Sequence, residues 1–187
     1  MSFYYWKTNF NLNDKEKQAL AYNNVKTLYV HYCDVGFSEE KKEAYPISTL
    51  GSVSSIHDYD IVPVIFIENL CFERLDAKGV KDLAKSIFTE VNFINSLSEI
   101  TTGEIQFDCD WTERSKDKYF LFLKEYKDLS KQTVSCTIRL HQVKYPERTG
   151  VPPVDRGTLM YYNMGAINAG PENSIYEKSV ASKYNSF

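Results

Sequence analysis

The sequence has no long apolar run. A membrane-spanning helix needs about 20 consecutive apolar residues, and no segment of the 187-residue chain approaches that length, so no membrane span is expected. The first residues also lack the basic start, apolar run and small-residue cleavage site of an export signal. As given, the chain is expected to be cytoplasmic. If an export signal has been removed from a longer precursor, the protein would instead be exported or periplasmic.

Cysteine and histidine are scarce as well. The four cysteines are far apart, and none forms the Cys-x-x-Cys spacing of zinc or redox sites. With three histidines in the whole chain, a multi-histidine metal site is disfavoured. We therefore predict no metal and no cofactor. The alternative is a metal-dependent hydrolase that uses His31, Asp34, Asp108 and His141, but strand parity predicts that His31 and Asp34 face opposite ways.

Charge of one sign is not concentrated anywhere along the chain. The 22 Lys and Arg residues are scattered among 25 Asp and Glu residues, which gives a net charge of -3 and a pI near 5.7. Nucleic-acid-binding proteins usually gather basic residues on one face, so we expect no nucleic-acid partner. The glycine-rich phosphate-binding motifs of nucleotide-binding folds are also missing from the sequence.

What the sequence does contain is a regular alternation of strand-like and helix-like segments. Residues 78–97 carry apolar side chains at three-and-four spacing, which is typical of an amphipathic helix. Residues 60–69 form a near-continuous apolar run, as parallel strands do when both faces are covered. The expected strands are 3–8, 27–35, 60–69, 104–112, 133–143 and 158–164, and the expected helices are 12–24, 78–97, 116–129 and 174–185. The polar segment 36–59 is interpreted as an insertion that builds a binding rim.

This alternation predicts an α/β fold, a (β/α) TIM-type barrel, in preference to an open sheet. A complete eight-stranded barrel takes at least about 200 residues, whereas six βα units fill this chain. We therefore expect residues 1–187 to be a single, incomplete barrel domain, the N-terminal fragment of a full barrel whose C-terminal strands are missing. Open strand edges invite pairing, so self-association through these edges is a further expectation.

Two neighbouring strands predict where a site would lie. In residues 104–112 the apolar side chains alternate with polar ones, among them Asp108 and Asp110, and in residues 133–143 the polar face carries Arg139 and His141. In a barrel the polar faces line the interior, and the strand ends reach the catalytic mouth. Two carboxylates beside an arginine and a histidine suit acid–base chemistry. The competing interpretation is a buried ion network in which Arg139 pairs with Asp108.

Other strand ends extend this predicted site. Asp34 ends the second expected strand and Glu68 ends the third, so both are expected at the same acidic rim. Trp6 and Tyr162, from the first and last expected strands, are candidates to stack on sugar rings. An acidic rim with aromatic side chains suits a hydroxylated ligand, and we therefore expect a carbohydrate ligand.

Four segments carry a resemblance to known proteins: FYYWKT at 3–8, IQFDCDWT at 105–112, TIRLHQVKY at 137–145 and GVPPVDRGTLMYYNMG at 150–165. They resemble an uncharacterised bacterial family with a glycosidase-like barrel. More distantly, the chain is similar to the chitinase-like barrels of glycoside hydrolase family 18, which have Asp-x-Asp-x-Glu on the fourth strand and Met-x-Tyr-Asp on the sixth. Asp108 and Asp110 match the two aspartates, and Met160, Tyr162 and Asn163 stand at the second motif.

The resemblance fails at the catalytic acid. Thr112 occupies the position of the motif's glutamate, and Glu113 is one residue out of register. The simplest remaining assignment makes Asp110 the general acid, with Asp108 or Glu68 as the second carboxylate and with Arg139, His141, Tyr162, Asn163, Asp34 and Trp6 as substrate-binding residues. This assignment predicts a glycoside-hydrolase-like enzyme that acts on a polysaccharide or glycan. The alternative is a barrel that binds a glycan or a partner without catalysis. A retaining or inverting outcome is not decided by these residues.

Overall fold

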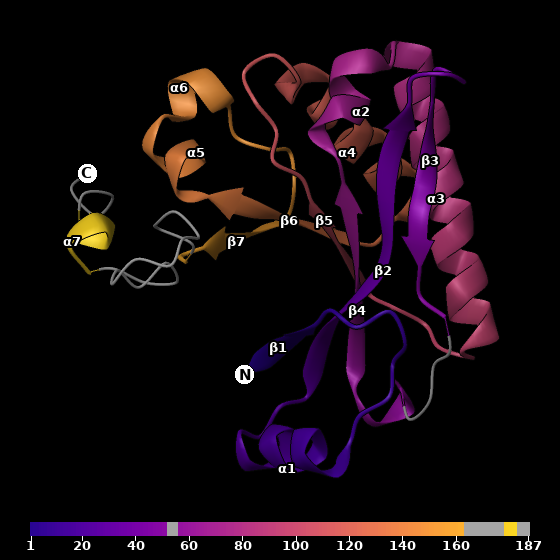
Figure 1. The fold of residues 1–187 in the computed structure, drawn as a ribbon, viewed down its shortest axis with the longest axis vertical. Coiled ribbons are helices and arrows are strands. Elements are labelled where there is room, and N and C mark those ends of the chain that lie inside the picture. The colour runs from indigo at the N-terminus through magenta and orange to yellow at the C-terminus, as the bar shows by residue number, and fades with distance from the viewer. Residues whose placement is uncertain (52–55, 163–177, 183–187) are drawn as a thin grey trace.

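The computed structural model describes residues 1–51, 56–162 and 178–182, in which seven strands form one sheet (Figure 1). The strands are β1 (Ser2–Tyr5), β2 (Thr27–Ser38), β3 (Glu43–Thr49), β4 (Asp60–Ile67), β5 (Glu104–Asp108), β6 (Thr133–Arg139) and β7 (Arg156–Met160). The helices are α1 (Asp14–Tyr22), α2 (Asn69–Arg74), α3 (Ala77–Leu97), α4 (Lys116–Ser130), α5 (Leu140–Lys144), α6 (Pro146–Thr149) and α7 (Lys178–Ala181), with a short 3-10 turn at Ile56–Asp58.

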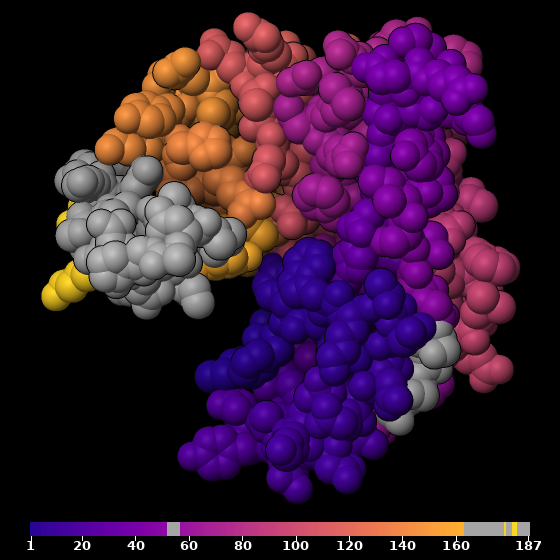
Figure 2. Space-filling model, viewed as in Figure 1, coloured from indigo at the N-terminus to yellow at the C-terminus, as the bar shows by residue number. Residues whose placement is uncertain are grey.

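The sheet order is β1-β2-β4-β5-β6-β7, and every neighbouring pair on this path is parallel. The strands curl into a half-barrel with α3 and α4 outside it, and β1 and β7 form its two edges (Figure 1). Figure 2 shows the same face in space-filling form, with the indigo N-terminal residues at the bottom and the orange residues of α5 and α6 at the upper left. The predicted incomplete TIM-type barrel is therefore confirmed.

The outer face of the sheet is covered by apolar helix faces, as the sequence spacing predicts. Helix α3 buries a stripe of residues three and four apart: Val80, Leu83, Ala84, Ile87, Val91 and Ile94. Its start is fixed by Asp76, whose carboxylate accepts a 2.7 Å hydrogen bond from the backbone N–H of Gly79. Beneath α4, the ring of Phe107 packs edge-on against Phe122 at 4.9 Å and against Tyr126 at 4.8 Å. None of the described helices is long and apolar enough to cross a membrane.

The inner face is polar and joined by side-chain hydrogen bonds. The buried amide of Gln106 on β5 accepts a 2.6 Å bond from the Tyr4 hydroxyl on β1 and donates to Thr158 on β7 at 3.0 Å. It also reaches Ser135 on β6 at 3.4 Å. Because these partners come from both edges of the sheet, the amide holds the sheet in its curled form.

Several strand boundaries differ from the prediction. Strand β5 ends at Asp108 rather than at residue 112, because the next residues leave the sheet for a turn in which the Ser115 hydroxyl accepts the Thr112 N–H at 2.9 Å. Strand β6 ends at Arg139, whose N–H donates to the Gln142 side chain at 2.7 Å and starts α5. The polar alternation that suggested longer strands therefore runs into a turn in one case and a helix in the other.

The predicted insertion at 36–59 is largely a hairpin. Strand β2 runs on to Ser38, and β3 returns antiparallel along it. The short helix α2 was not predicted. Strand β1 ends at Tyr5 instead of residue 8, and β7 runs from Arg156 to Met160 instead of from 158 to 164. Of the predicted last helix at 174–185, α7 is described, and most of the rest lies outside the described residues.

The aromatic cluster under α4 gives a stability prediction. Phe107→Ala removes a fully buried ring and leaves a cavity, so we expect it to lower the free energy of unfolding by about 3–5 kcal/mol. Phe93→Ala on α3 is the matched control, since that ring is 55% exposed and its loss should change stability by less than about 0.5 kcal/mol. Urea denaturation of the three proteins makes the comparison. Equal losses in both variants would contradict this account of the core.

Candidate functional site

The site is built around Asp108, the last residue of the central strand β5. Its side chain faces the inside of the half-barrel, where it is 5% exposed and accepts a 2.6 Å hydrogen bond from the Thr137 hydroxyl on β6. Burial raises the pKa of the Asp108 carboxyl above its usual value. The hydrogen bond from Thr137 and the charge of Arg139 lower this pKa, but the effect of burial is larger. The nearby Asp110 carboxylate adds to the increase in the Asp108 pKa. The surroundings of Asp108 therefore favour the protonated form.

Asp110 has the opposite surroundings. It follows β5, its side chain is 56% exposed, and its carboxylate accepts a hydrogen bond from the Arg139 Nε in an ion pair. The competing interpretation of the sequence paired Arg139 with Asp108, but in the structure Arg139 pairs with Asp110. A buried carboxyl with a raised pKa and an exposed carboxylate paired with arginine thus lie two residues apart at one strand end. Two carboxyl groups in such different surroundings are common in acid–base sites.

A second polar cluster lies on β2. His31 is buried, and its Nε2 lies 2.7 Å from Asp34 Oδ1, while the Ser48 hydroxyl on β3 donates to Asp34 Oδ2 at 2.7 Å. The expectation that His31 and Asp34 face opposite ways is therefore wrong. The reason is a register shift between His31 and Cys33 in the pairing with β4, which turns the following side chains over.

His31 also carries an unsatisfied atom. Its Nδ1 is buried and has no hydrogen-bond partner among the described residues. The imidazole contributes to the electrostatic environment of Asp108, so it belongs to the same interior. Nevertheless, no group of three or more His, Cys, Asp or Glu side chains in the described parts of the chain is arranged to hold a metal ion.

Aromatic side chains stand at the edges of the half-barrel. Trp6 follows β1, is 47% exposed, stacks on Tyr4 with 6.0 Å between ring centroids and lies 5.1 Å from the His31 ring. Tyr162, just after β7, is exposed and contributes to the electrostatic environment of Arg139. Both predicted aromatic residues therefore border the polar interior. Asn163, the other residue predicted there, lies outside the described residues.

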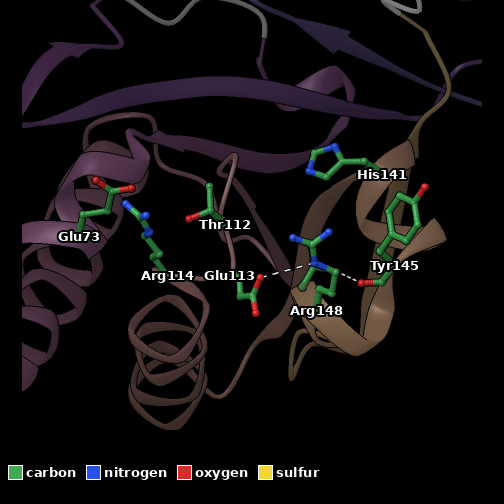
Figure 3. Close-up of a pocket in the computed structure, with 8 residues that line it drawn as sticks. Glu73, Thr112, Glu113, Arg114, His141, Tyr145 and Arg148 are labelled. Carbon is green, nitrogen blue, oxygen red and sulfur yellow. Dashed lines mark hydrogen bonds and ion pairs between the residues drawn. The ribbon is translucent and has the colours of Figure 1, made fainter.

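Glu68 and His141 lie elsewhere on the rim. Glu68 follows β4, and its Oε2 lies over Gly36 of β2, 3.1 Å from where a Cβ would stand. Within the described chain, no hydrogen bond or ion pair joins Glu68 to either aspartate. His141 was predicted on a strand beside Asp108, and this placement is wrong: it lies exposed on α5 and lines a separate cleft, because the chain leaves the sheet at Arg139 (Figure 3).

The sequence identified the polar faces of the strands but not the residues whose hydrogen bonds hold the site side chains in place. Thr137 fixes the Asp108 carboxylate, Gln106 joins three other strands to β5, and Ser48 fixes Asp34. The alternation in residues 104–112 and 133–143 already placed Gln106 and Thr137 on the inner face. Ser48 gave no such signal, because its role depends on the antiparallel return of β3.

Comparison with known proteins shows similarity in fold. No family model matches the sequence, and no curated protein matches it. Among solved structures, a chitinase from Rhizomucor miehei is 12% identical, with a TM-score of 0.52 over 98% of this chain and 58% of that chain. Two others have lower TM-scores.

One of these two is the Bacteroides thetaiotamicron EndoBT-3987 with a Man5GlcNAc product, which is 11% identical, with a TM-score of 0.49 over 91% of this chain and 46% of its own. The other, a class V chitinase from Nicotiana tobaccum, is 12% identical, with a TM-score of 0.47 over 88% of this chain and 52% of its own. The chain thus spans less than two thirds of the length of these proteins. The resemblance to chitinase-like barrels is confirmed as a similarity in fold to the Rhizomucor miehei chitinase.

Proposed function

We propose that this protein is a glycoside-hydrolase-like barrel that acts on a polysaccharide or glycan through carboxylate acid–base chemistry. One observation carries the proposal: at the end of the central strand, Asp108 is buried with a raised pKa, while Asp110, two residues further on, is exposed and paired with Arg139. The chitinase-like fold supports a carbohydrate ligand, and the exposed Trp6 beside the interior offers a surface on which a sugar ring can stack.

The proposed roles follow from the surroundings of each carboxylate. Asp108 accepts the Thr137 hydroxyl on Oδ1, which leaves Oδ2 as the atom that holds the proton. Asp110 is exposed and paired with Arg139, so it meets the sugar as a carboxylate and stabilises positive charge in an oxocarbenium-like transition state. This reverses the sequence-based assignment, which made Asp110 the acid. Glu68, at the end of the neighbouring strand, remains the proposed third carboxylate of the rim.

The second candidate function is glycan binding without turnover. Thr112 stands where the chitinase motif carries its catalytic glutamate, and its hydroxyl faces the Ser115 hydroxyl at 3.4 Å in the turn before α4. A threonine there can hydrogen-bond a ligand but cannot protonate a leaving group at neutral pH. Under this alternative the same rim residues, Asp110, Arg139 and Trp6, bind the sugar.

The first test is Asp110→Asn in the full-length protein, assayed on a panel of polysaccharides and oligosaccharides. Loss of the carboxylate should lower kcat/KM by about 10²- to 10⁴-fold on any substrate that the wild-type protein cleaves. Asp128→Asn is the matched control, because it removes the same charge from an exposed position on α4. Unchanged turnover by the Asp110 variant would contradict the catalytic assignment. Binding without turnover by the wild-type protein would favour the second candidate.

Asp108 gives a test that does not need a substrate. Because its pKa is raised in the folded state, the folded protein holds this proton more tightly than the unfolded chain does. The contribution of this group to stability is therefore fully present below the usual Asp pKa of 3.8 and is lost as the pH rises through the raised value. Asp108→Asn removes that dependence.

We therefore expect Asp108→Asn to become more stable relative to wild type as the pH rises from about 4 to about 7, measured as an increasing difference in the free energy of unfolding. Denaturant titrations across this range measure the difference. Asp128→Asn is the matched control, since it makes the same substitution at an exposed position. A difference between Asp108→Asn and wild type that is constant with pH would show that burial does not hold Asp108 in its protonated form.

A further inference from the structure

A cleft of about 780 Å³ lies outside the barrel interior, beyond the ends of β5 and β6 (Figure 3). It is bounded by the end of α2, by the residues between β5 and α4, and by α5 and α6. Ligand pockets commonly have volumes of roughly 300 to 1,000 Å³. The cleft adjoins the proposed site, because Thr112 in its lining follows Asp110 closely in the chain, and His141 likewise follows Arg139.

Two arginines and a histidine line this cleft from separate elements. Arg114 comes from the segment before α4, Arg148 from α6 and His141 from α5 (Figure 3). The two acidic lining residues are each engaged: Glu113 lies 3.5 Å from Arg148, and Glu73 accepts a 3.0 Å hydrogen bond from Asn69.

The charge of Arg114 is left without a partner, since within the described residues no carboxylate pairs with it. The Glu113–Arg148 pair is long, and both side chains are largely exposed, so it contributes little to stability and can be exchanged for a ligand anion. Figure 3 shows the two guanidinium groups apart, that of Arg114 toward Glu73 and that of Arg148 beside Glu113, so they are available to separate anionic groups of one extended ligand.

The backbone around the cleft is held in place by buried hydrogen bonds. The Trp111 indole donates to the Thr149 carbonyl at 3.0 Å, and the Gln142 amide donates to the Trp111 carbonyl at 3.1 Å. From α4, the Lys116 ammonium donates to the Arg148 carbonyl at 2.8 Å. These bonds fix α5 and α6 against the start of α4. The arginines therefore project from a rigid frame, which reduces the ordering cost of binding.

We propose that this cleft is a subsite for an acidic sugar residue. Arg148 binds its anionic group, a carboxylate or a sulfate ester, Arg114 binds that of an adjoining acidic residue, and the exposed ring of Tyr145 lies against the sugar. The inference rests on the proposed function and narrows its substrate class to anionic glycans. The Asp110–Arg139 pair then contacts the neighbouring unit of the same chain.

The test is binding of the full-length protein to an array of immobilised glycans in three sets: neutral oligosaccharides, uronate-containing oligosaccharides without sulfate, and sulfated oligosaccharides without uronate. We expect the wild-type protein to prefer one of the two anionic sets, and the preferred set identifies the anion. Titration calorimetry with a hexasaccharide of that set, hexagalacturonate or a carrageenan hexasaccharide, then measures the affinity of the variants.

Arg114→Ala and Arg148→Ala should each weaken that affinity by about tenfold or more. Arg114→Lys keeps the charge but loses the paired N–H groups, so an intermediate affinity is expected. Lys78→Ala, which removes an exposed charge from a residue of α3 that does not line the cleft, is the control and should bind as the wild type does. Thermal unfolding of each variant confirms that the fold is retained.

Three outcomes would overturn the subsite. One is a wild-type protein that binds neutral glycans at least as tightly as anionic ones, in which case the proposed function stands and only this inference fails. Another is an anionic preference that survives both arginine substitutions, or is weakened equally by Lys78→Ala. The third is a protein that binds no glycan in any of the three sets, which would remove the proposed function as well.

Discussion

The side-chain amide of Gln106 is the interaction on which the shape of this molecule depends. It sits on the central strand and is bonded to Tyr4 on one edge strand and Thr158 on the other, so that it draws the two edges toward one interior. A buried amide must satisfy its donors and acceptor, and in this sheet curling is what brings the partners within reach. An apolar residue at this position would leave the inner polar groups of β1, β6 and β7 without their common partner.

The candidate site follows from that curvature. Asp108 lies on the same face as Gln106, two residues further along β5, and is buried inside the curled sheet. Asp110 lies beyond the end of the strand, where solvent and Arg139 reach it. Burial and exposure therefore change within a few residues, so that two identical side chains have different surroundings: one is desolvated with a raised pKa, and the other is exposed and ion-paired. The same logic places His31 and Asp34 together, since the register shift in β2 brings both into the interior.

The rim is built by the chain after it leaves the strands. The turn at Thr112 and Ser115 starts α4, and the bond from Arg139 to Gln142 starts α5, so the residues beyond β5 and β6 form a second, more basic wall outside the acidic interior. A bound glycan would therefore meet two different environments along its length. One offers carboxylates and an aromatic ring, and the other offers guanidinium groups. The proposed preference for an anionic glycan depends on that change of charge along the binding path.

Sequence alone determined the barrel-type α/β fold, the helix α3, the inner and outer faces of β5 and β6, and the placement of Asp108 on the inner face. It could do so because apolar periodicity and strand alternation are local properties of the chain. Only the tertiary structure decided which groups meet: that Arg139 pairs with Asp110, that Ser48 and His31 converge on Asp34, and that His141 lies on a helix in a separate cleft. These outcomes depend on a register shift, on where strands end and on hydrogen bonds between distant residues, none of which leaves a local pattern in the sequence.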